Sequence, residues 1–206
     1  MNRKCNHGYK NESGDCYSCI LIKKQLEDPV LLKKRKEEAG IKKKFFDVDF
    51  DGFFKQCKHV ELKNIGEEML RYDLKHNILM IGNTGTFKTY LAVATLINAI
   101  KSGFTGYYAK FYELTQMQIH DNAKFNKMCN VDLLVIDEFG IGKSDYKSEL
   151  LFQIIDTRYD NEQPTIIISN KGKEEVKNCM TDATYSRIVE NREAYSFDFT
   201  DSRVKD

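Results

Sequence analysis

The segment Gly82–Thr89, with the sequence GNTGTFKT, constrains the fold of this chain more than any other feature. It follows an apolar run at 77–81 that is typical of a strand, and it precedes a stretch in which apolar residues recur at helical spacing. A tight glycine turn between a strand and a helix points backbone N–H groups and the positive helix end at a phosphate. The segment therefore predicts a phosphate-binding loop. Its position disfavours the alternative of a plain glycine turn.

The usual phosphate loop has Gly, four residues, Gly-Lys and then Ser or Thr, and this segment departs from it only at Phe87, which replaces the second glycine. We expect Lys88 to reach the β and γ phosphates of ATP and the Thr89 hydroxyl to bind Mg²⁺. Phe87 is expected to require ordinary backbone angles, and so to weaken binding or alter the loop. The residues predicted to bind the nucleotide are Gly82, Asn83, Thr84, Gly85, Thr86, Phe87, Lys88, Thr89 and Asp137.

Two carboxylates follow the apolar run VDLLVI at 131–136. A run without polar alternation is typical of a buried parallel strand, and an open parallel sheet binds its ligands at the carboxyl ends of its strands. We therefore expect Asp137 to hold Mg²⁺ and Glu138 to act as the general base that polarises the attacking water. Asn170, after the run at 165–169, is expected to orient that water. The alternatives are an acidic loop and an ordinary turn residue.

Strand-like and helix-like segments alternate, which predicts an α/β fold with a parallel sheet flanked by helices. The expected strands are 77–81, 107–111, 131–136, 165–169 and 195–199. The expected helices are 20–38 with a bend at Pro29, the segment from the phosphate loop to Gly103, 112–128, 144–160 and 173–192. A phenylalanine-rich connector at 45–54 needs a surface to pack on.

Charge is divided unevenly, although the total of 32 Lys and Arg and 31 Asp and Glu is only +1. Residues 1–44 hold twelve basic and six acidic residues, and residues 45–206 hold twenty and twenty-five. The basic clusters 33–36 and 42–44 fit DNA phosphates, an acidic partner surface or solvated helix faces. Strand periodicity favours the core, rather than base stacking, for the aromatic residues Tyr107, Tyr108, Phe111 and Tyr112.

No run of eighteen apolar residues occurs and the first residues lack a secretory signal, so we expect a cytoplasmic protein without a membrane span. In such a protein, clustered cysteines indicate metal more than disulfides. Cys5, His7, Cys16 and Cys19 form two close pairs that suit a tetrahedral Zn²⁺ site. Because few apolar residues surround them, zinc would supply most of the folding energy of this segment. The alternative is a reduced arm without metal.

Three stretches, VDLLVIDEFG, PTIIISN and AGIKKKFFDVDFDGFF, resemble the DnaC/DnaI-type helicase loaders, a group of AAA+ ATPases that also includes the IstB-type transposition ATPases. The resemblance covers residues 39–206. It implies an AAA+ core at 41–206, preceded at 1–40 by a zinc-binding module and helix that contact the helicase. It also implies that nucleotide state times the delivery of a replicative hexameric helicase onto single-stranded DNA. Shortness and Lys- and Asn-rich composition suggest a phage or mobile element as the source, and hence the host cytoplasm.

The resemblance also implies roles for single residues. Walker A is matched by Lys88 and Thr89, Walker B by Asp137 and Glu138, and sensor 1 by Asn170. Arg187 resembles an arginine finger that reaches the γ-phosphate of a neighbouring subunit, which implies self-association through the ATP site. The alternative is a helix arginine in a salt bridge. Arg203 lies where a sensor 2 arginine is expected, and Arg158 fits the family pattern with a role that is open.

Two other functions stay open beside the ATP-dependent loader. An IstB-type ATPase that recruits a transposase would have the same core. Phe87 motivates the other alternative, an adaptor or decoy that binds the helicase without hydrolysing ATP. We expect an ATPase whose activity is weakened by Phe87.

Overall fold

Five short parallel strands form the centre of the molecule. A computed structural model describes residues 28–140, 142, 144–190 and 194–199 of the chain. The strands are β1 (Ile78–Gly82), β2 (Gly106–Lys110), β3 (Leu133–Asp137), β4 (Thr165–Ile168) and β5 (Tyr195–Phe197). Their order across the sheet is β2-β3-β4-β1-β5. The predicted α/β class and parallel sheet are confirmed, and the strand ends shift by no more than two residues.

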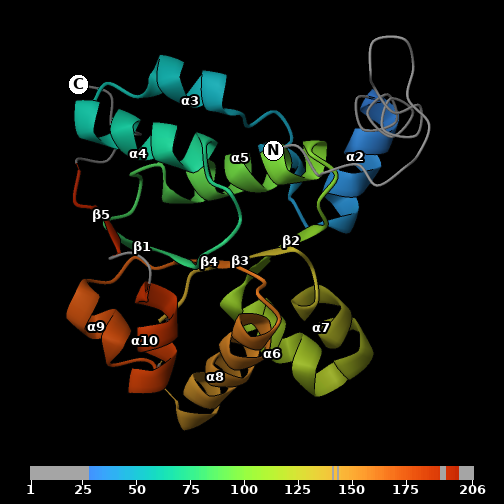
Figure 1. The fold of residues 1–206 in the computed structure, drawn as a ribbon, viewed down its shortest axis with the longest axis vertical. Helices are drawn as coiled ribbons and strands as arrows, with labels where there is room; N and C mark the ends of the chain where they lie inside the picture. The colour runs from blue at the N-terminus through green and yellow to red at the C-terminus, as the bar shows by residue number, and fades with distance from the viewer. Residues whose placement is uncertain (1–27, 141, 143, 191–193, 200–206) are drawn as a thin grey trace.

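Helices cover both faces of this sheet (Figure 1). One face carries α2 (Pro29–Glu38), α3 (Phe50–Gln56), α4 (Val60–Leu70) and α5 (Lys88–Lys101), with the short helix η1 (Lys43–Phe45) before α3. The other face carries α6 (Phe111–His120), α7 (Asn122–Cys129), α8 (Asp145–Asp160), α9 (Lys173–Lys177) and α10 (Asp182–Val189). Because α5 lies between the sheet and the helices α2 to α4, it is buried on almost all sides.

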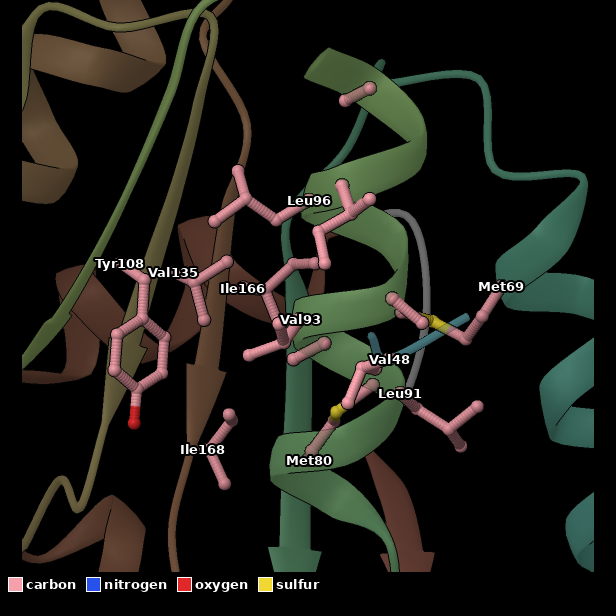
Figure 2. Packing of buried hydrophobic residues seen from close by; sticks show 14 of the residues in the cluster. Val48, Met69, Met80, Leu91, Val93, Leu96, Tyr108, Val135, Ile166 and Ile168 are labelled. Carbon is pink, nitrogen blue, oxygen red and sulfur yellow. The ribbon is translucent and has the colours of Figure 1, made fainter. Parts of the chain in front are cut away.

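Apolar side chains fill the layers on both sides of the sheet. Under α5, Val93 and Leu96 pack toward Val135 and Ile166 in the middle of β3 and β4 (Figure 2). On the opposite face, the next residues of the same strands, among them Ile136, pack against α6, α7, α8 and α10. This double burial explains why these strands show no alternation of polar and apolar residues.

The expected bend at Pro29 is wrong. Pro29 is the first residue of α2, where the missing N–H of proline and its fixed φ suit a helix start. The side chain of Asp28 caps the helix by accepting from the backbone N–H groups of Val30 and Leu31. Residues 20–27 of the expected helix lie outside the described residues.

Each of two other expected helices, 112–128 and 173–192, is divided into two shorter ones: α6 and α7, and α9 and α10. In both cases a polar side chain caps the start of the second helix. Asp121 accepts from the backbone N–H of Lys124, so that α7 begins there. Thr181 accepts in the same way from Thr184 at the start of α10. The periodicity also gave no indication of α4. Within the described part of the chain, no helix has the length and apolar character needed to cross a membrane.

Arg158 on α8 ties two strand starts together from a buried position. It is 1% exposed, and its guanidinium donates to the hydroxyl of Thr165 at 2.8 Å and to the carbonyl oxygens of Cys129, Val131 and Pro164 at 2.5, 2.9 and 2.6 Å. Burial lowers the pKa of Arg158 to about 10, which leaves the group charged at neutral pH. The role of Arg158, which the sequence left open, is therefore structural: it provides hydrogen-bond donors for the buried carbonyl groups before β3 and β4.

Replacing Arg158 by Met should lower the free energy of unfolding by about 3 kcal/mol, because buried carbonyl groups lose a charged donor. Urea denaturation measures the loss. The matched control is Arg71→Met, which removes an exposed pair with Glu67 and should cost at most about 0.5 kcal/mol. Equal losses in the two variants would show that the buried contacts do not stabilise the fold.

Candidate nucleotide-binding site

The loop from β1 to α5 has backbone angles that require glycine at two positions. Gly82 has φ 123°, and a Cβ atom there would lie 2.7 Å from the carbonyl oxygen of Phe197 on β5. Gly85 has φ 76°. Helix α5 then begins at Lys88, and its first N–H groups lack partners within the helix. This arrangement suits the binding of a phosphate group.

Phe87 corrects the expectation drawn from its sequence. It has φ 65° and ψ 5°, the left-handed conformation in which glycine is usual, rather than ordinary angles. A residue with a Cβ atom is destabilised there by about 1–2 kcal/mol. Its ring meets Phe53 and Tyr90 edge-on, with centroids 5.4 and 5.7 Å apart, and each such pair stabilises by about 0.5–1.5 kcal/mol. These contacts offset the strain, so the loop keeps its shape.

Lys88 turns its ammonium group into the loop. Its Nζ donates to the carbonyl oxygen of Gly82 at 2.8 Å, to the hydroxyl of Thr86 at 3.2 Å and to the carbonyl oxygen of Asn83. The residue is 4% exposed. The ammonium group of Lys88 is thus already held inside the loop. Phosphate oxygens bound there would replace these acceptors.

Thr89 and Asp137 meet at the carboxyl end of the sheet, as the sequence predicts. The Thr89 hydroxyl donates to Oδ2 of Asp137 at 3.0 Å, and Oδ1 of Asp137 accepts from the backbone N–H of Glu138 at 2.7 Å. A hydroxyl beside a carboxylate provides the oxygen ligands that Mg²⁺ prefers. Tyr108 on β2 donates to the same Oδ2 at 2.8 Å, a contact that no sequence pattern revealed.

Glu138 is held by a lysine at the end of β2. Its Oε1 lies 2.6 Å from Nζ of Lys110, and the hydrogen bond to this carboxylate raises the pKa of Lys110. Glu138 also has φ 57°, a strained conformation that clusters at functional sites. The carboxylate predicted to act as a base is therefore close to Asp137 and bound to a cation of its own chain.

Asn170 reaches the same region from β4. The hydroxyl of Ser169 donates to the carbonyl oxygen of Phe139 at 2.7 Å. The backbone N–H of Phe139 donates to the carbonyl oxygen of Ile168 at 2.9 Å. These bonds join the ends of β3 and β4. Asn170, the next residue, is exposed and lines the cavity that Lys88 and Glu138 also line.

This cavity has a volume of about 630 Å³, within the range of small-molecule sites. Its wall also includes residues to which the sequence analysis gave no part in the nucleotide site: Lys42, Lys44, Phe45, Gln56, Tyr90, Tyr108 and Lys110. The Nζ of Lys44 lies 4.7 Å from the ring centroid of Phe45. Tyr90 follows the loop on α5, and Tyr108 and Lys110 come from β2, which pairs with β3. The others come from the segment that runs from Lys42 to the end of α3, and α3 packs on α5. The four lysines on the wall suit a polyphosphate.

Arg187 lies at the opposite end of the sheet. Its carbonyl oxygen accepts from the side chain of Asn77, which precedes β1, and the five residues of β1 separate that point from the loop by about 16 Å. The guanidinium pairs with Asp156 at 2.6 Å and lies over the rings of Phe152 and Tyr159. Arg187 is therefore no part of the nucleotide site of its own chain. The predicted zinc ligands Cys5, His7, Cys16 and Cys19, and Arg203, lie outside the described residues.

Two substitutions of Phe87 separate the strain of the loop from the packing of the ring. Phe87→Ala should be the least stable chain, because alanine keeps the left-handed strain and loses the ring contacts. Phe87→Gly should recover about 1 kcal/mol of this loss and remain below the original chain. Urea denaturation gives the order of the three stabilities. An alanine variant as stable as the glycine variant would show that the left-handed conformation at position 87 is not strained.

Comparison with known proteins identifies relatives of this chain. An insertion-sequence ATP-binding protein of Geobacillus stearothermophilus (IS5376) is 36% identical over 107 residues, which cover 48% of this chain and 42% of that protein. The replicative helicase loader DnaC of Escherichia coli K12 is 36% identical over 64 residues, 31% of this chain and 26% of the loader. The matched segments thus span less than half of these two relatives.

A crystal structure of the DnaC helicase loader shares the fold, with a TM-score of 0.65 and 24% identity over 76% of this chain and 99% of that one. The profile of the IstB-like ATP binding proteins matches residues 38–196, which include every strand of the sheet except the end of β5. The chain therefore belongs to the family of IstB-like ATP-binding proteins.

Proposed function

We propose that this chain is an ATP-dependent loader that delivers a replicative hexameric DNA helicase onto single-stranded DNA. The observation that carries the proposal is the arrangement of Lys88, Thr89, Asp137 and Glu138 around one cavity, on a fold shared with the DnaC loader. The sequence match to DnaC of Escherichia coli supports the same role.

ATP fits the cavity through the chemistry of its donors. The loop N–H groups and Lys88 would hold the phosphates, and Thr89 and Asp137 would hold Mg²⁺, which neutralises charge on the phosphate oxygens. Glu138 would polarise the attacking water, which Asn170 would help to orient. The pair between Glu138 and Lys110 has to open first, because a carboxylate bound to an ammonium group is a poor base. Lys110 therefore restrains hydrolysis.

Substitutions at Glu138 and Lys110 test this chemistry. Glu138→Gln should retain ATP binding and reduce phosphate release by at least about 100-fold, since the base is removed. Lys110→Met should raise phosphate release by up to about five-fold, the factor that corresponds to a partly exposed ion pair worth about 1 kcal/mol.

The matched control is Lys34→Met, which removes the exposed pair with Glu38 on α2 and should leave the rate unchanged. If the original chain binds ATP but releases no more phosphate than the Glu138→Gln chain, the ATPase is refuted and the adaptor or decoy is favoured. A slower Lys110→Met chain would mean that this lysine assists hydrolysis instead of restraining it.

Arg187 is proposed as the arginine finger of a self-associated form. It lies at the end of the sheet remote from its own loop, so only a neighbouring subunit could receive it. One terminal nitrogen, NH1, is buried and has no hydrogen-bond acceptor among the described residues, while the other pairs with Asp156. To act as a finger, the guanidinium would have to leave Asp156 and exchange this pair for a group on the neighbour. The γ-phosphate of ATP on a neighbour is such a group.

Residues 1–40 are proposed to contact the helicase, with Zn²⁺ bound by Cys5, His7, Cys16 and Cys19. The spacing of these ligands is the support for the metal. Within the residues that the structure describes, no group of three or more His, Cys, Asp or Glu side chains could hold a metal ion, and the four proposed ligands lie outside those residues. Residues 41–206 would form the ATPase core.

A second candidate is an ATPase that recruits a transposase. The insertion-sequence relative from Geobacillus stearothermophilus favours it, since it matches a longer segment than DnaC of Escherichia coli. The nucleotide site would work in the same way, so the partner decides between the two functions.

Co-purification from the native host tests both candidates. The full chain should retain a hexameric helicase and contain about one equivalent of zinc. A chain that begins at Asp28 keeps every described helix and strand, and it should lose both. Cys16→Ser together with Cys19→Ser should behave like the truncation, whereas Cys179→Ser is the matched control. A captured transposase would refute the loader, and zinc below about a tenth of an equivalent would refute the metal site.

A further inference from the structure

The carboxylate of Asp137 is held by three donors of its own chain. Oδ1 accepts from the backbone N–H of Glu138, and Oδ2 accepts from the hydroxyls of Thr89 and Tyr108 at 3.0 and 2.8 Å. Thr89 and Asp137 are proposed ligands of Mg²⁺, but the chemistry described above gives Tyr108 no part. Its hydroxyl nevertheless makes the shorter of the two contacts to Oδ2.

Tyr108 reaches Asp137 along the sheet. Strand pairing sets Lys110 of β2 opposite Asp137 of β3. Tyr108 lies two residues before Lys110, which is about 7 Å along the strand. Its ring packs beside Val135, and its hydroxyl points toward the carboxyl end of the strands, at the level of Ile168 (Figure 2). The hydroxyl is the donor in this contact, because a carboxylate oxygen can only accept.

The rest of Tyr108 is fixed as well. Its backbone N–H donates to the carbonyl oxygen of Ala39 at 2.8 Å, and its ring meets Phe45 edge-on with the centroids 6.3 Å apart. Gly40 allows the chain to pass, since a Cβ atom there would lie 2.6 Å from the carbonyl oxygen of Tyr108. A side chain held at both ends aims its hydroxyl with little freedom, as the support of a metal ligand requires.

We propose that Tyr108 is a positioning residue for the magnesium site, whose hydroxyl holds Oδ2 of Asp137 against the hydroxyl of Thr89. The inference rests on the proposed binding of ATP with Mg²⁺ and goes beyond it. Because Tyr108 acts on the carboxylate and not on the nucleotide, its loss should weaken Mg²⁺ and leave metal-free nucleotide binding as it was. A hydroxyl with a merely structural role would change both affinities together or neither.

Tyr108→Phe in the full chain removes only this hydroxyl. The matched control is Tyr107→Phe, which removes a hydroxyl from the preceding residue, on the opposite face of the same strand and outside the cavity. ADP is the ligand, so that hydrolysis does not interfere. Calorimetry gives the affinity for ADP in a chelator and then across a titration with Mg²⁺.

In the Tyr108→Phe chain, the Mg²⁺ concentration at half effect should rise by about 10-fold, the loss typical of a removed support of a metal ligand. The metal-free affinity, and both values for Tyr107→Phe, should stay unchanged. An unchanged Mg²⁺ midpoint, or an equal loss of metal-free affinity, would overturn the role of Tyr108. If the original chain binds ADP without any effect of Mg²⁺, the magnesium site itself is wrong and Tyr108 positions nothing there, although nucleotide binding stands. Failure to capture a helicase would refute only the loader.

Discussion

The burial of α5 is the constraint on which the nucleotide site depends. The helix is packed against the sheet on one side and against α2, α3 and α4 on the other, so it can neither rotate nor slide. Its first residue is Lys88 and its second is Thr89, which places both side chains at the end of β1. Asp137 then has to meet Thr89, because β3 ends at the same edge of a parallel sheet. The geometry of the site thus follows from the packing of one helix.

Phe87 shows that this packing also stabilises a backbone conformation that the residue itself disfavours. The ring is fixed between Phe53 of α3 and Tyr90 of α5, and Gly66 of α4 leaves room for Phe53. The usual phosphate loop has a glycine at this position, whereas the shape of this loop depends on the helices that hold Phe87. The exchange ties the phosphate loop to α3 and α4, which lie outside the strand–loop–helix unit.

The sequence allowed the sheet and the two ends of the nucleotide site to be predicted, because both depend on local order along the chain. Uninterrupted apolar runs mark buried parallel strands, and Asp137 follows one of them directly. Helix ends were less predictable, since the cap at Asp121 competes with an unbroken helical pattern. The contacts of Tyr108 and Lys110 could not be predicted. They come from an edge strand and depend on its register with β3.

That edge strand gives the site two opposite influences from two residues that lie two positions apart on the same face of the strand. Tyr108 donates a neutral hydroxyl to Asp137, which orients the carboxylate without pairing it with a positive charge. Lys110 brings a full charge to Glu138, which occupies the carboxylate that we propose as the base. In the proposed mechanism, Tyr108 would favour binding and Lys110 would restrain hydrolysis, and both side chains project from β2. For a protein whose nucleotide state is proposed to time the release of a partner, a site that binds before it hydrolyses is the arrangement that timing requires.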